Sequence, residues 1–168
     1  YRRQQGFTQF RYLLGEGILS KNDTTDSVID AIATGCYKDA RKSVEAAKAT
    51  LDVLSARYPM VLVSNFYGNI QAVLDDFKLT SYFPVVIESA VVGVRKPDPA
   101  IFRLGVEALA LQPEEVVVIG DSYRKDIQPA QSLGCDTIWI KGAGWDDSEA
   151  AVHHDKIITD IAQLQELL

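Results

Sequence analysis

Residues 116–126 read Val-Val-Val-Ile-Gly-Asp-Ser-Tyr-Arg-Lys-Asp, and they are the most informative part of this chain. Four consecutive β-branched residues predict a strand buried on both faces, as in a parallel sheet covered by helices. Gly120 and Asp121 follow where that strand would end, which is where open α/β sheets keep their chemistry. Carboxylates at this place either hold a hard cation or cap the next helix, so other strand ends must decide between the two.

Strands and helices alternate through most of the remaining chain. Pro59 ends a helical region, and from about residue 58 onward short apolar runs alternate with amphipathic segments. The expected strands are 60–63, 85–87, 116–119, 137–140 and 156–158, and the expected helices are 69–78, 99–111, one after Asp126 that closes at Gly134, and 160–168. Repeated units of this kind predict an α/β fold with a parallel, doubly wound, Rossmann-like sheet.

The N-terminal part of the chain has a helical pattern without strand-like runs. Apolar residues at spacings of three and four predict a first helix on Phe7, Phe10 and Leu14, and a second on a stripe from Val28 to Cys36. A third helix is expected over residues 41–57. We therefore expect a small, partial helical cap at residues 1–40 and an α/β core at residues 41–168.

Composition excludes several classes of partner. The 17 basic and 23 acidic residues leave a net charge of -6, so a general attraction to nucleic acid or anionic lipid is not expected. No apolar run approaches the roughly 18 residues of a membrane span, and no signal peptide opens the chain. These observations predict a cytoplasmic protein with neither a nucleic-acid nor a membrane partner.

The end of the first predicted strand carries polar groups. Ser64 and Asn65 follow residues 60–63, and Gly68 and Asn69 precede a helix. Backbone N–H groups there, with Ser64 Oγ, can bind an anionic oxygen. The alternative is structural, with Ser64 as a turn residue and Asn69 as a helix N-cap.

Lys96 lies in a loop stiffened by Pro97 and Pro99. A lysine held on a rigid loop can neutralise a phosphate or a carboxylate with little loss of freedom on binding. A solvated surface charge is the alternative. The third candidate site is Asp121 with Asp126, because two carboxylates at one strand end suit Mg²⁺, whereas Zn²⁺ would call for His or Cys ligands.

In order and spacing, these groups resemble the motifs of the haloacid dehalogenase-like hydrolase superfamily, in its branch with a helical cap. The resemblance runs from Ser64 through the Lys-Pro-Asp-Pro run at 96–99 and Gly-Asp-Ser at 120–122 to residues 134–140. It implies that Ser64, Asn65 and Lys96 bind the phosphoryl group, with Ser64 and Lys96 catalytic. It also implies that Asp121 ligates Mg²⁺, and that Asp126 supports either the metal shell or Lys96. The cap would close over the substrate.

The family's first motif is absent from the sequence. That motif is an aspartate nucleophile at a strand end with a second aspartate two residues later, and the chain contains no Asp-x-Asp. In the family the strand carrying it lies in the middle of the sheet, between the strands that end at Ser64 and at Asp121. We therefore expect a sheet without its first central strand, and oligomers formed through the unpaired edges.

The resemblance implies a Mg²⁺-dependent phosphatase that acts on a small phosphorylated metabolite through an aspartyl-phosphate intermediate. We interpret the chain as a fragment of that enzyme, without the nucleophile and inactive alone. One alternative is a 2-haloacid dehalogenase-type hydrolase, which needs no metal. Asp121 and Asp126 argue against it, because they would repel a carboxylate substrate. The other alternative is a non-catalytic binding or regulatory module of the same fold.

Overall fold

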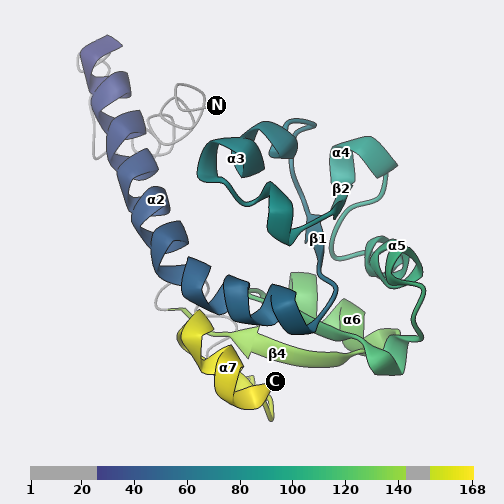
Figure 1. Cartoon of the computed structure of the whole chain (residues 1–168). Helices are drawn as coiled ribbons and strands as arrows, with labels where there is room; N and C mark the ends of the chain where they lie inside the picture. Colours follow the sequence, from purple (N-terminus) through teal and green to yellow (C-terminus); the bar gives the residue numbers. More distant parts are fainter. Residues whose placement is uncertain (1–25, 143–151) are drawn as a thin grey trace. The chain divides into compact units, whose positions relative to one another are not determined.

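The computed structural model describes residues 26–142 and 152–168 (Figure 1). The chain divides into two compact units, Tyr1–Lys48 and Ala49–Leu168. The first predicted helix, with Phe7, Phe10 and Leu14, lies outside the described residues. The boundary expected at residue 40 falls within a helix and stays a prediction.

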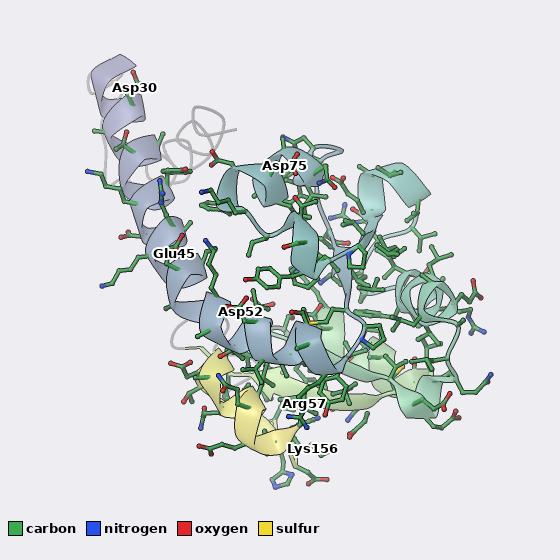
Figure 2. All side chains as sticks on the ribbon, viewed as in Figure 1. Asp30, Glu45, Asp52, Arg57, Asp75 and Lys156 are labelled. Carbon is green, nitrogen blue, oxygen red and sulfur yellow. The ribbon has the colours of Figure 1, made fainter. Side chains whose placement is uncertain are left out.

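Helix α2 (Asp26–Arg57) is continuous over 32 residues, where the sequence pattern predicted two helices. The separate helices were wrong because no proline interrupts this stretch and Gly35, in open space, costs only about 1 kcal/mol in a helix. The helix ends just before Tyr58 and Pro59, as predicted. Charged side chains such as Asp30 and Glu45 are exposed along α2 (Figure 2). Among the described residues, no helix is long and apolar enough to cross a membrane.

The strands form two parallel sheets. In the first, β1 (Val61–Ser64) pairs with β2 (Val85–Glu88). In the second, β4 (Asp136–Ile140) lies between β3 (Val117–Gly120) and β5 (Ile157–Ile158). Every pair is parallel, and helices follow the strands, so the predicted α/β class is confirmed.

No strand of the described residues joins the two sheets, and β1 and β3 are end strands of their sheets. Within the described residues, each of these strands has a hydrogen-bonded neighbour on one side only. Both nevertheless contribute to the same hydrophobic cluster, Val61 and Val63 from one strand and Val118 from the other. The predicted burial of the 116–119 run on both faces is wrong, because Ile119 is 37% exposed beside this open edge. The expected absence of one central strand stays a prediction.

Helices on the strand connections build the core. After β1 and β2 come α3 (Ile70–Phe77), η2 (Thr80–Tyr82), α4 (Ser89–Val92), α5 (Ala100–Leu109) and η3 (Pro113–Glu115). After β3 come η4 (Tyr123–Ile127) and α6 (Gln128–Ser132), and the chain closes with η6 (Ile161–Gln163) and α7 (Leu164–Leu167). Asp98 Oδ1 accepts the Ala100 N–H at 2.9 Å, as expected of a capping side chain, but α5 begins one residue later than predicted and its N-cap position is Pro99. The single turn α4 was not predicted.

Two hydrophobic clusters fix the strands under the helices. One joins Ile101, Phe102 and Val106 of α5 to Ile87 of β2. The other consists of Leu54, Ile138, Ile158 and Leu164, and it packs the last turns of α2 and α7 against β4 and β5. Burial of such side chains contributes about 1.5–3 kcal/mol each, so the clusters hold the strand ends in place.

Candidate active site

Three strands end at one edge of the α/β unit. Ser64 is the last residue of β1 and lies in register with Glu88, the last residue of β2. Gly120 ends β3, and Asp121 follows it. Parallel strands have their carboxyl ends at the same edge of a sheet, and the segments after these strands carry the predicted site residues. Contacts between those segments bring the residues together.

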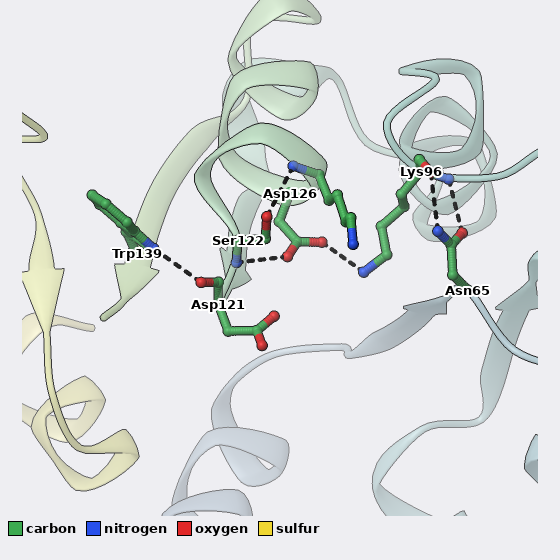
Figure 3. Close-up of polar contacts among 7 residues, drawn as sticks. Asn65, Lys96, Asp121, Ser122, Asp126 and Trp139 are labelled. Atoms are coloured by element: carbon green, nitrogen blue, oxygen red, sulfur yellow. Dashed lines mark hydrogen bonds and ion pairs between the residues drawn. The ribbon is translucent and has the colours of Figure 1, made fainter. Parts of the chain in front are cut away.

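Lys96 and Asp126 form the central contact of the site. Lys96 Nζ lies 2.6 Å from Asp126 Oδ1, and the side chains are 17% and 5% exposed (Figure 3). Asp126 Oδ2 accepts the Ser122 N–H at 3.1 Å, so both carboxylate oxygens have donors. Lys96 Nζ also lies 5.9 Å from the centre of the Phe102 ring. A buried ion pair with these hydrogen bonds keeps an ammonium group at a fixed place.

Gly120 makes this arrangement sterically feasible. A Cβ atom added to Gly120 would lie 2.3 Å from Asp126 Cβ and 2.9 Å from Asp126 Oδ2. Real Cβ atoms do not approach so closely, so only glycine lets Asp126 lie directly against the end of β3. The sequence placed a glycine at this strand end, but only the structure shows what it accommodates.

A π-helical turn brings Asp126 to this position. The helix that the sequence predicted after Asp126 begins before that residue, with η4. In η4 the N–H groups of Asp126 and Ile127 both donate to the Ser122 carbonyl. Pro129 follows in the first turn of α6 and has no N–H to donate to a carbonyl of the preceding turn. Such π turns are frequent at functional sites, and this one directs Asp126 inward.

Asn65 joins the first strand end to the Lys96 loop. Its Nδ2 donates to the Lys96 carbonyl at 3.0 Å, and its Oδ1 accepts the Lys96 N–H at 2.8 Å (Figure 3). The side-chain amide therefore holds the backbone of Lys96. That Asn65 binds phosphate stays a prediction, and because its side-chain amide is engaged by Lys96, the group left for that role is its backbone N–H.

Asp121 is exposed at the end of β3. Its backbone carbonyl accepts the indole N–H of Trp139 at 3.1 Å, and Trp139 is 2% exposed in β4. The Trp139 ring lies 5.5 Å from that of Tyr123. Figure 3 shows the Asp121 carboxylate directed away from the indole. Trp139 was missed, although a tryptophan in a buried strand signals that its N–H needs a partner.

Glu88 and Ser89, at the end of β2, were also missed. Glu88 Oε1 accepts the backbone N–H groups of Gly68 and Asn69, the latter at 3.1 Å. Ser89 Oγ accepts the Phe66 N–H at 3.1 Å. A buried glutamate at a predicted strand end was the signal, because such a carboxylate requires donors.

The donor set fits Mg²⁺ in part. Among the described residues no group of three or more His, Cys, Asp and Glu side chains surrounds a common point. Mg²⁺ needs only one or two protein carboxylates, because waters and substrate phosphate complete its octahedral shell. The exposed Asp121 carboxylate meets that requirement, whereas the Asp126 carboxylate is engaged by Lys96 and Ser122.

Comparisons with known proteins agree with these motifs. A family model described as haloacid dehalogenase-like hydrolase matches residues 8–134. The chain is 36% identical over 93 residues to glyceraldehyde 3-phosphate phosphatase of Pyrococcus furiosus, covering 54% of this chain. It is 35% identical over 120 residues to phosphoglycolate phosphatase of Yersinia pestis, covering 70% of this chain.

A solved structure gives a similar result. The crystal structure of a HAD phosphatase from Thermococcus onnurineus superposes with a TM-score of 0.60 at 28% identity, covering 75% of this chain and 54% of that one. The chain spans 39% of the Pyrococcus protein and 51% of the Yersinia protein. The matches therefore concern about half the length of these proteins.

Proposed function

Because the chain belongs to the haloacid dehalogenase-like hydrolase family, we propose that it is part of a Mg²⁺-dependent phosphatase that hydrolyses a small phosphorylated metabolite. Relatives named as phosphatases of glyceraldehyde 3-phosphate and of phosphoglycolate support this substrate class. The residues of the site support the same chemistry.

The observation that carries the proposal is the fixed ammonium group of Lys96. In a chain of net charge -6, a phosphate dianion needs a local positive site. The Lys96–Asp126 pair and the two Asn65 hydrogen bonds hold that charge beside the strand ends. Pre-organised positive charge is the main protein contribution to phosphoryl transfer, because charge must be stabilised on the phosphoryl oxygens.

Each site residue has a proposed role. Ser64 Oγ and the Asn65 N–H donate to phosphoryl oxygens, and Lys96 bridges the phosphate and the nucleophile. Asp126 positions Lys96 rather than binding metal directly, since both of its oxygens already accept hydrogen bonds. Mg²⁺ held by Asp121 would, when bound, offset the negative charge of the phosphate.

The nucleophile belongs to a strand that fits between β1 and β3. Both strands have one open edge within the described residues, and both pack on one hydrophobic cluster. An inserted parallel strand would end beside Ser64 and Asp121, where an aspartate could attack phosphorus to give an aspartyl phosphate. The sequence has no Asp-x-Asp, so this strand would come from outside the 168 residues.

Phosphate binding tests the site in the chain itself. Inorganic phosphate with Mg²⁺ is titrated into the wild-type chain and into Lys96→Ala and Arg95→Ala variants, and binding is followed by calorimetry. Arg95 is exposed and adjacent in sequence, so it is the matched control. We expect Lys96→Ala to weaken binding tenfold or more and Arg95→Ala to change it little. Equal affinity in all three proteins would overturn the proposed role of Lys96.

Turnover tests the fragment interpretation. Hydrolysis of an aryl phosphate with Mg²⁺ is compared between the 168-residue chain and a version extended N-terminally with its natural upstream residues. We expect activity only in the extended protein, and its loss on chelation. Equal activity in both proteins would overturn the interpretation.

A further inference from the structure

We propose that Glu88 and Ser89 are positioning residues that fix the phosphate-binding loop at residues 64–69. This inference rests on the proposed function, because it assigns to that loop the role of holding phosphate. Neither residue belongs to the motifs that identified the site. Both follow β2, and both bond to the backbone of the loop after β1.

Glu88 carries the stronger evidence. It is only 6% exposed, and a buried carboxylate is costly unless donors surround it. Its Oε1 accepts the N–H groups of Gly68 and Asn69 at the start of α3. Because one carboxylate oxygen accepts two successive backbone N–H groups, Glu88 fixes the C-terminal end of the loop.

Ser89 fixes the middle of the loop. Its Oγ accepts the Phe66 N–H at 3.1 Å, and its hydroxyl lies 3.3 Å from the Phe66 carbonyl, to which it donates. Because Ser89 contacts both backbone groups of one residue, the peptide orientation around Phe66 is fixed. Ser64 and Asn65 immediately precede this point.

These contacts determine which groups of the loop serve phosphate. The N–H groups of Phe66, Gly68 and Asn69 are bonded within the protein. Fewer backbone N–H groups of the loop therefore remain for an anion than the sequence predicted. Gly68, whose N–H is bonded to Glu88, adopts φ +89°, a conformation that glycine tolerates. With the loop held from β2, the backbone that carries Ser64 and Asn65 has less conformational freedom.

The hydrogen bonds from Glu88 and Ser89 to the loop are tested first by hydrogen exchange. Amide exchange at Phe66, Gly68 and Asn69 is measured by NMR in the wild type and in Glu88→Ala, Glu88→Gln and Ser89→Ala variants. Glu107→Gln, on the exposed face of α5, is the matched control. We expect faster exchange of Gly68 and Asn69 in Glu88→Ala, and partial protection in Glu88→Gln because an amide oxygen still accepts. Wild-type exchange rates of Gly68 and Asn69 in Glu88→Ala would overturn the proposal that Glu88 fixes the loop.

The positioning role is tested by phosphate affinity of the same variants, under conditions where their amide spectra show a folded chain. We expect inorganic phosphate with Mg²⁺ to bind about tenfold more weakly to Glu88→Ala, with partial rescue by Glu88→Gln and no change in the control. A folded Glu88→Ala variant with faster exchange but wild-type affinity would overturn the positioning role. A wild-type chain with protected amides that binds no phosphate would instead overturn the proposed function, and the role of the loop with it.

Discussion

Replacing Gly120 by alanine tests the packing that holds the Lys96–Asp126 pair. The added Cβ would lie 2.3 Å from Asp126 Cβ, and ordinary van der Waals contact begins at 3.4 Å. One of the two residues must therefore move by at least about 1 Å. Asp126 is 3% exposed and its Cβ is close to the backbone, so a side-chain rotation cannot remove the clash.

The magnitude follows from two contributions. Overpacking of this kind costs about 1–3 kcal/mol. A shift of about 1 Å also stretches the contacts of Asp126 with Lys96 and Ser122, which are 2.6 and 3.1 Å long, and weakening charge-assisted bonds costs about 1.5–3 kcal/mol. Together these contributions should lower the free energy of unfolding of Gly120→Ala by roughly 2.5–6 kcal/mol.

The assay is urea unfolding followed by circular dichroism, with Gly35→Ala as the matched control. Gly35 lies within α2 and has no atom within 4 Å of an added Cβ, so the same substitution should stabilise that helix by up to about 1 kcal/mol. The two glycine-to-alanine changes should therefore have opposite signs.

A double variant isolates the clash itself. Asp126→Gly removes the three atoms nearest to the added Cβ, so in that background Gly120→Ala should cost much less than in the wild type. Gly120→Ala with wild-type stability would refute the packing argument. The same cost in both backgrounds would show that the clash with Asp126 is not its cause.

Three further predictions concern the metal, the thiols and the open strand edge. Titration with Mg²⁺ should change the fluorescence of Trp139, whose indole bonds to the Asp121 carbonyl, and Asp121→Asn should abolish the change; a response kept in that variant would remove Asp121 from the metal site. Burial, with a nearby glutamate, raises the pKa of the Cys135 thiol, whereas Cys36 is exposed, so a thiol reagent at pH 8 should modify Cys36 quickly and Cys135 only after unfolding. The folded state favours the neutral Cys135 thiol. The resulting contribution to the free energy of unfolding is complete below the ordinary thiol pKa and is lost as pH rises through the raised value. Comparing the unfolding of Cys135→Ala and wild type from pH 7 to 10 checks this direction. Ile119→Lys should reduce concentration-dependent association in size-exclusion chromatography, because a charge beside an open edge opposes strand pairing; unchanged elution would show that this edge does not mediate it.

The sequence predicted the type of fold because its signals are local. Short apolar runs, the proline after Tyr58 and the Asp98 cap each act within a few residues, and the structure has strands and helices close to the predicted positions. The continuity of α2 was missed because an apolar stripe interrupted by polar residues does not show whether a helix ends. The placement of Ser64 and Asp121 at strand ends, and of Lys96 in the loop before α5, also followed from the sequence, since polar residues after short apolar runs are a local signal.

Tertiary structure alone decided how the site residues are held. Asn65 bonds to the backbone of Lys96, 31 residues away, and Lys96 pairs with Asp126, 30 residues further on. Glu88 and Trp139 support these loops from β2 and β4, and neither contact could be read from the local sequence. A hydrogen bond depends on distances of a few ångströms and on direction, and these are fixed only when segments far apart in the chain pack against one another.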